Sequence, residues 1–205
     1  MTLSLVIDTA TSRCAVALIQ DKKILWQGHH DGATSHGSAL PALVAQGLEH
    51  ESQSVEKIEE VLVGMGPGPF TGLRIGIVFA QTFSTARKIP LRGFSSLDAI
   101  AKGLSEVDEF ILATDARRKE IYWATYRAGK RVSGPNVGSP ALLEGSDLPI
   151  FGEGAVKYRL TTSELAQFPD LLGMVLLSAD PSQEVFEPLY LRRPDAVPTL
   201  ERKLL

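Results

Sequence analysis

Residues 62–78 read LVGMGPGPFTGLRIGIV: an apolar run typical of a strand, a turn rich in glycine and proline, and a run typical of a helix. A glycine-rich turn that opens a helix often binds phosphate, because the first N–H groups of a helix have no partner within it. The known phosphate motifs do not match this one. No Gly-Lys-Ser/Thr follows the turn, and Pro69 or Thr71, depending on the register, replaces the third glycine of the dinucleotide fingerprint. The stretch therefore indicates a turn and a helix built for another purpose.

The composition is that of a globular chain with one large domain or two small ones. The 205 residues carry 21 basic and 24 acidic side chains, so the net charge of −3 gives no general attraction for nucleic acid. The single cysteine, Cys14, excludes an internal disulfide and lies in an apolar run, where we expect a buried small side chain rather than a nucleophile. The N-terminus lacks the basic start of a signal peptide, and no apolar run reaches the ~20 residues of a membrane span. A cytoplasmic protein without membrane contact is expected.

Hydrophobic periodicity predicts alternating strands and helices in the first half. Thr71, with its side-chain oxygen, suits the N-cap of the helix that follows the glycine-rich turn. The expected strands cover residues 3–7, 13–19, 22–27, 60–64 and 90–94, and the expected helices cover 38–49, 55–60, 72–87 and 95–104.

The second half opens as the first half does. Residues 110–114 form an apolar run that ends at Asp115, as residues 3–7 end at Asp8, and a polar turn and a further strand follow each acid. Two interpretations are open. The halves contain either two unrelated hairpins or a duplicated β-β-β-α-β-α unit, which is the arrangement of the α/β actin-like (ASKHA) fold.

A polar, acidic stretch at 103–109 suits a boundary between the two units. The expected division is an N-terminal actin-like subdomain at 1–103 and a reduced C-terminal subdomain at 104–205. Periodicity weakens after Gly134, and one helix near 162–178 is expected, so the second unit is predicted to be truncated.

Four stretches together resemble the bacterial TsaB (YeaZ) family. The resemblance implies a non-catalytic subunit of the machinery that makes threonylcarbamoyladenosine beside the anticodon of tRNA. It also implies pairing with the catalytic subunit TsaD, which shares the fold, work with the ATPase TsaE, a homodimer when alone, and contact with tRNA only through the complex. The stretches are Ile7-Asp8-Thr9-Ala10-Thr11, the run from Gly66 to Gly76, Asp115-Ala-Arg-Arg-Lys-Glu-Ile-Tyr122 and Glu187-Pro-Leu-Tyr-Leu-Arg192.

One position departs from the pattern of the family. Its central motif usually has serine where this chain has Pro69. Proline removes both a hydroxyl group and a backbone N–H from the turn, which weakens an anion-binding interpretation.

The two hairpin turns are interpreted as degenerate nucleotide loops. Actin-like enzymes hold phosphate with turns of the type Asp-x-Gly-x-Thr/Ser, where glycine avoids crowding the phosphate. The turn with Asp8, Thr9 and Thr11 has no glycine, nor does the turn that follows Asp115. We expect both acids to cap their own turns rather than to hold Mg²⁺. The run Arg117-Arg118-Lys119 is expected to be a solvated basic loop, with contact to an anion or RNA as the alternative.

No catalytic residue, cofactor site or metal site is predicted. The histidines His29, His30, His36 and His50 include no pair with the i, i+4 spacing that places two ligands on one helix face. No Gly-x-Ser-x-Gly motif occurs. The leading hypothesis is a binding and scaffolding subunit. The alternatives are an actin-like ATPase or phosphotransferase with unusual phosphate loops and, with no nucleophile–base pair to support it, a peptidase that acts on its partner.

The helix predicted at 72–87 is apolar on nearly every side. Small residues recur at every fourth position, and a row of small side chains lets another backbone approach closely. We predict that this face, with Arg74 beside it, packs on the matching helix of a second subunit, either another copy or TsaD, so that the two assemblies compete for one surface. The alternative is burial of both faces within one domain. The row consists of Gly72, Gly76, Ala80 and Ser84.

Overall fold

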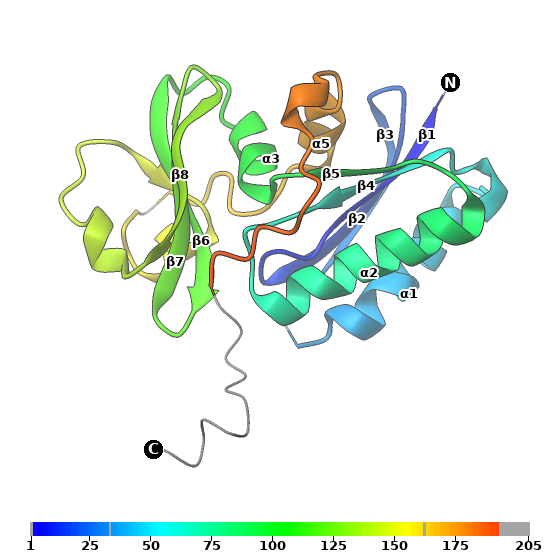
Figure 1. Cartoon of the computed structure of the whole chain (residues 1–205), viewed down its shortest axis with the longest axis horizontal. Coiled ribbons are helices and arrows are strands. Elements are labelled where there is room, and N and C mark those ends of the chain that lie inside the picture. The colour runs from blue at the N-terminus through cyan, green and yellow to red at the C-terminus, as the bar shows by residue number, and fades with distance from the viewer. Residues whose placement is uncertain (1, 33, 162, 193–205) are drawn as a thin grey trace, which may run out of the picture.

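The computed structural model describes residues 2–32, 34–161 and 163–192. Within these residues the chain forms two β-sheets side by side, with two short helices between them and further helices on the outer faces (Figure 1). In the same residues, no helix combines the length and the apolar character that a membrane crossing requires.

The first sheet has the strand order β3-β2-β1-β4-β5. Strand β1 pairs antiparallel with β2 and parallel with β4. All five strands were expected near these positions, although β3 extends beyond its predicted end. The bounds are β1 Leu3–Asp8, β2 Arg13–Gln20, β3 Lys23–Asp31, β4 Glu60–Gly64 and β5 Leu91–Phe94.

The second sheet repeats the first in reduced form, with the order β8-β7-β6-β9. Strand β6 pairs antiparallel with β7 and parallel with β9, as β1 does with β2 and β4. A 3₁₀ turn at Pro140–Leu143 occupies the chain position where the first unit has its long first helix. The predicted duplicated, truncated actin-like arrangement is therefore confirmed. The strands are β6 Glu109–Arg117, β7 Glu120–Arg127, β8 Lys130–Gly138 and β9 Ile150–Phe151.

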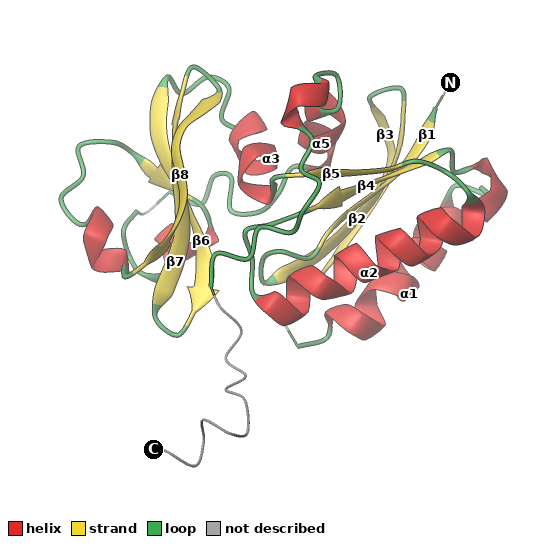
Figure 2. Ribbon diagram, viewed as in Figure 1, coloured by secondary structure: helices red, strands yellow, loops and turns green. Residues whose placement is uncertain are grey.

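The helices cover both faces of each sheet, and two of them lie between the sheets (Figure 2). Helices α1 and α2 pack on one face of the first sheet, against the side chains of Leu5, Ile7 and Val16. Helix α5 packs on the opposite face, against Val6 and Ala17, because side chains alternate between the two faces of a strand. The bounds are α1 His36–His50, α2 Phe70–Arg87, α3 Ser96–Lys102, α4 Glu153–Lys157 and α5 Leu171–Leu177, with a 3₁₀ turn at Val55–Lys57.

Each half of the chain contributes one helix to the hydrophobic core of the other half. Helix α3, from the first half of the chain, contributes Leu97 and Ile100 to the core of the second sheet. Helix α5, from the second half, contributes Leu171 and Met174 to the core of the first sheet. Each sheet is formed by strands from one half of the chain, but the helices between the sheets belong to both cores.

Two expectations about helix limits were wrong. Helix α2 begins at Phe70 with Pro69 at its N-cap position, so Thr71 lies exposed inside the first turn and is not the cap. The fixed φ of proline, here −58°, suits the start of a helix. The helix expected at 162–178 is shorter than predicted and consists of α5 alone. Asp170 is its N-cap residue, and its carboxylate accepts a hydrogen bond from the Leu172 N–H at 3.0 Å. Residue 162 and the predicted second unit beyond residue 192 lie outside the described residues.

Four glycines bring α2 and the preceding turn against the β1–β2 turn. They recur at every fourth residue, and a Cβ on any of them would lie under 3.0 Å from an atom of Asp8, Thr9 or Ala10. Real Cβ atoms essentially never approach other atoms so closely. The glycine row therefore exists to let two backbone segments of the same chain touch. Its members are Gly64, Gly68, Gly72 and Gly76.

We expect Gly76→Ala to destabilise the protein by about 2–3 kcal/mol, because its new methyl group meets the Thr9 hydroxyl and the helix has to shift. The matched control is Gly37→Ala in α1, where the glycine is also helical but exposed, with its nearest neighbour 3.9 Å away. This control should gain about 0.5–1 kcal/mol from helix propensity. Urea unfolding measures both variants, and a Gly76→Ala protein as stable as the wild type would contradict the close-contact explanation.

Candidate functional site

The first hairpin turn is held by Asp8, a side chain with 0% exposure. One carboxylate oxygen accepts the Ala10 N–H at 2.8 Å, and the other accepts the Ser96 hydroxyl at 2.6 Å. Burial in this apolar setting raises the pKa of Asp8 to about 6, although the Ser96 hydrogen bond opposes the shift. The bond to Ala10 is that of a turn-capping carboxylate, as expected.

The two threonines of this turn are also committed to the chain itself. The Thr9 hydroxyl donates to the Gly72 carbonyl at 2.8 Å and accepts the Gly76 N–H at 3.1 Å, so it joins two backbone groups of one turn of α2. The buried Thr11 hydroxyl accepts the Arg13 N–H at 3.2 Å. The Thr11 carbonyl accepts the Nε2–H of buried His36 at 3.1 Å.

Asp115 occupies the corresponding place in the second hairpin turn. Its Oδ1 accepts the Arg117 N–H at 3.1 Å, which is again a turn-capping bond, and the Tyr158 hydroxyl at 3.1 Å. Its Oδ2 accepts Lys157 Nζ at 2.6 Å. The structure thus places Asp8, Thr9, Thr11 and Asp115 as buried side chains in two equivalent hairpin turns, each with hydrogen-bond partners in the chain.

Glu153 ties the two turns together, and its role was missed from sequence. Its carboxylate accepts the Ser12 N–H at 3.2 Å and also the Ser12 hydroxyl, across the junction of the two units. Burial raises the pKa of Glu153 despite these bonds. Beside this contact, the Tyr122 hydroxyl donates to the Gly68 carbonyl at 3.3 Å. The sequence signal is an acid placed between two glycines, Gly152 and Gly154.

The small face of α2 does not form an open surface, which corrects the interface prediction. Gly72, Gly76 and Ala80 are buried against the chain's own first unit. The Ser84 hydroxyl donates to the Ile89 carbonyl at 2.9 Å. Only Arg74 of the predicted interface residues is exposed, so the alternative of burial within one domain is the correct one.

The outer side of α2 forms an open apolar groove of about 510 Å³ with α1. Phe70 is 42% exposed and Val78 is 47% exposed, which is high for large apolar side chains in one patch. The α1–α2 groove is lined by Gly37, Leu40, Pro41, Phe70, Thr71, Arg74, Ile75, Val78 and Phe79.

The segment after α5 crosses from the first sheet to the second hairpin turn (Figure 1). The Leu189 N–H donates to the Met65 carbonyl at 2.8 Å, and the Tyr190 ring lies 5.0 Å from the ring of Phe70. Arg192 ends the segment with a hydrogen bond to the Ala116 carbonyl at 3.2 Å and an ion pair with Glu120. The closing stretch of the chain therefore joins the start of α2 to the β6–β7 hairpin.

Neither a metal centre nor a thiol nucleophile is assembled in the part of the chain that the structure describes. No group of three or more His, Cys, Asp or Glu side chains is placed to hold a metal ion there. Cys14 is buried, and burial raises the pKa of its thiol to about 12, as expected for a core side chain.

The sheets, the paired turns and the helices between them define a protein with the actin-like fold. The family model of TsaD, tRNA N6-adenosine threonylcarbamoyltransferase, matches residues 30–174. The solved structure of YeaZ from Pseudomonas aeruginosa superposes with a TM-score of 0.70 at 24% identity, covering 87% of this chain and 91% of that one. A second solved structure, of a protein with similarity to peptidase YeaZ from Pseudomonas aeruginosa, superposes with a TM-score of 0.75 at 24% identity. The match covers 94% of this chain and 100% of that one.

Sequence relatives agree with the structural likeness. A Mycobacterium tuberculosis protein without an assigned function is 37% identical over 201 residues, which are 95% of this chain and 93% of that protein. A Mycobacterium leprae protein is 38% identical over 207 residues, and the chain spans 57% of its length. The tRNA threonylcarbamoyladenosine biosynthesis protein TsaB of Escherichia coli is 35% identical over 127 residues, 60% of this chain and 54% of that protein. The chain belongs to the TsaB (YeaZ) family.

The stability contributed by Asp8 should depend on pH in a predictable direction. The raised pKa means that the folded carboxyl keeps its proton between pH 3.8 and about 6, where the unfolded chain has lost it. The contribution of the Asp8 carboxyl group to the free energy of unfolding is fully present below pH 3.8 and is lost as the pH rises through 6. The free energy of unfolding changes by about 3 kcal/mol over this range. Asp8→Asn cannot titrate, so its free energy of unfolding relative to the wild type should improve by about 2–3 kcal/mol between pH 4 and pH 7.5. Denaturant titrations at both pH values measure this difference, and a difference that stays constant would contradict the assignment.

Proposed function

We propose that this chain is a non-catalytic subunit in tRNA threonylcarbamoyladenosine biosynthesis, where it binds and supports TsaD. The names of its TsaB relatives and the TsaD family model support the pathway. The observation that carries the non-catalytic role is the self-occupied first turn, in which the Thr9 hydroxyl and both oxygens of Asp8 already have partners in the chain.

Nucleotide chemistry in this fold needs free groups at the hairpin turns. A phosphate needs unpaired N–H groups, and Mg²⁺ prefers carboxylate oxygens that can turn toward it. Here Gly68 and α2 press against the backbone of Thr9 and Ala10, and Glu153 takes the Ser12 N–H. A nucleotide bound in this position would have to break these contacts. The same turns that support catalysis in actin-like enzymes therefore act as structural joints in our proposal.

The α1–α2 groove is the surface we assign to TsaD. Its exposed apolar side chains need a partner of complementary shape, and a protein of the same fold offers an equivalent helix pair. A second copy of this chain offers the same helix pair, so a homodimer and the TsaD heterodimer would compete for the groove. This assignment keeps the predicted helix but replaces its small inner face with its outer face.

The other members of the complex follow from this division of labour. In this proposal the ATPase TsaE supplies the nucleotide hydrolysis, which we do not assign to this chain. The net charge of −3 favours contact with tRNA through the assembled complex rather than strong binding by the lone chain.

We expect Val78→Asp to weaken association with TsaD by roughly 30-fold or more, because a charge would be buried in the interface. The monomer should keep its stability, since Val78 is 47% exposed. The matched control is Val132→Asp on β8 of the other unit, because Val132 is also an exposed valine, at 54%. The Val132→Asp protein should bind TsaD as the wild type does. Calorimetric titration with TsaD measures both variants. Wild-type affinity in the Val78→Asp protein would remove the groove from the interface.

The isolated chain should bind ATP no better than roughly the millimolar range, about −4 kcal/mol, because both turns lack glycine and their polar atoms are occupied. Calorimetry with ATP and Mg²⁺ tests this directly. Micromolar binding, or turnover near ~1 s⁻¹ by the lone chain, would favour the actin-like ATPase or phosphotransferase instead.

A further inference from the structure

The tip of the β6–β7 hairpin has a backbone that its residues do not favour. Arg117, Arg118 and Lys119 all have positive φ, at 63°, 52° and 62°. Left-handed positions in tight turns favour Gly, Asn and Asp. The other two tight turns of the sheets each place such a residue, Asp21 or Gly129, at one of their left-handed positions. Three long cationic side chains at this tip are therefore not explained by turn geometry.

Cationic side chains are concentrated around this tip, although the chain as a whole carries more acidic than basic residues. Lys157 Nζ and the Arg117 guanidinium share the carboxylate of Asp115, at 2.6 Å and 3.5 Å. Arg192 pairs with Glu120 on the other side of the turn. Five cationic side chains thus gather around this tip in a chain whose net charge is −3. We define this basic patch as Arg117, Arg118, Lys119, Lys157 and Arg192.

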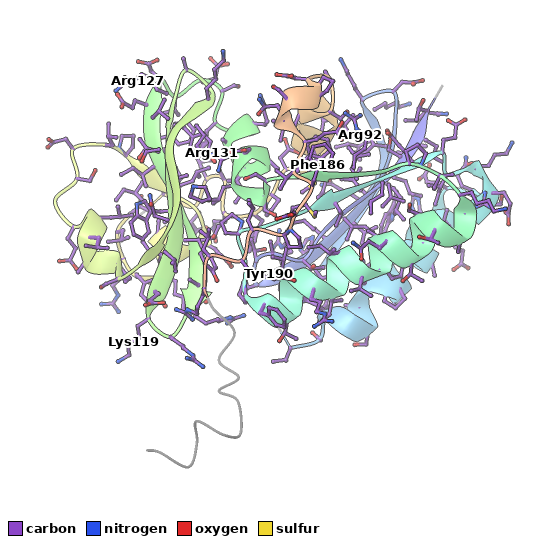
Figure 3. The ribbon with its side chains drawn as sticks, in the orientation of Figure 1. Arg92, Lys119, Arg127, Arg131, Phe186 and Tyr190 are labelled. Carbon is purple, nitrogen blue, oxygen red and sulfur yellow. The ribbon has the colours of Figure 1, made fainter. Side chains whose placement is uncertain are left out.

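The basic patch adjoins an exposed aromatic pair and the groove assigned to TsaD. Tyr190, 40% exposed, precedes Arg192 by two residues, and its ring lies tilted at 39° against the ring of Phe70, which also lines the α1–α2 groove. Figure 3 places Lys119 at the lower tip of the hairpin and Tyr190 on the crossing segment that leads toward it. Cations beside an exposed ring suit RNA, because phosphates bind the cations and an unpaired base can stack on the ring.

We propose that the basic patch contacts the sugar–phosphate backbone of the tRNA held by the complex with TsaD. The inference rests on the proposed function, which brings RNA to the groove side of the molecule. Guanidinium and ammonium groups at an exposed hairpin tip match phosphate oxygens spaced along a strand. An acidic protein surface is the competing partner, and the experiment below separates the two.

The test replaces the strained cations by the residues that a tight turn prefers. Arg118→Asn with Lys119→Gly removes two positive charges while relieving the left-handed strain, so the melting temperature should rise by about 2 °C or more. The complex of this double variant with TsaD should bind an unmodified transcript of a tRNA that reads codons beginning with A about tenfold more weakly at ~0.1 M salt. The slope of log affinity against log salt should fall by about 1.5, as expected for two lost phosphate contacts.

The matched control is Lys22→Gly with Lys88→Gly. These lysines also have positive φ, at 70° and 55°, so the control removes equal charge and relieves similar strain. Lys88 ends α2, ~27 Å along the helix from Phe70. The control complex should bind the transcript as tightly as the wild type does.

Gel filtration with TsaD comes first, because a wild-type chain that does not pair would remove the proposed function and this inference with it. Normal pairing with unchanged tRNA affinity in the Arg118→Asn, Lys119→Gly protein would overturn the inference alone. Loss of TsaD binding in that variant would make the patch a protein contact and overturn it as well. If the control complex bound the transcript as weakly as the Arg118→Asn, Lys119→Gly complex does, the loss of affinity would come from overall charge. That result would also contradict a local contact.

Discussion

The contact between the Thr9 hydroxyl and two backbone groups of α2 determines how the first unit is assembled. The hydroxyl donates to the Gly72 carbonyl and accepts the Gly76 N–H, and both positions lack a Cβ: at Gly76 it would meet the hydroxyl itself, and at Gly72 it would meet the Thr9 carbonyl oxygen. This contact fixes α2 against the end of β1, and Gly64 and Gly68 continue the same close packing along β4 and its turn. Once α2 is held there, its outer side and α1 define the apolar groove. One hydrogen-bonded junction thus fixes both the interior and the exposed surface.

The duplicated turns show how one backbone arrangement can be stabilised in two different ways. Each acid caps the N–H two residues on, but Asp8 is enclosed with Ser96, whereas Asp115 binds Lys157 and lies near Arg117. Burial without a cation leaves the first carboxyl with a raised pKa. The second turn instead presents cationic side chains, Arg118 and Lys119, at the surface. The first turn has therefore become part of the core, while the second has kept an exposed, charged tip.

Sequence patterns predicted the strands, the duplication and the existence of α2, because alternation and helical period are local properties. The packing of α2 could not be predicted in the same way. A row of small residues identifies a face that something approaches closely, but not whether that partner is another subunit or the same chain. Here it is Thr9, 63 residues before Gly72. The role of Glu153 was hidden for the same reason, since its partner Ser12 lies 141 residues away.

The two sides of α2 are under opposite physical constraints, and for this reason we propose recognition on the outer side. The inner side requires glycine, which lowers the intrinsic stability of a helix by about 1 kcal/mol per residue, so α2 depends on docking against the first turn. Neither Gly72 nor Gly76 can gain a Cβ without disturbing that contact. The outer side carries no such restriction, yet it exposes Phe70 and Val78, whose burial would be favourable. Exposed apolar surface on a helix that is rigidly held from behind is suited to partner binding, because little conformational freedom remains to be lost on association.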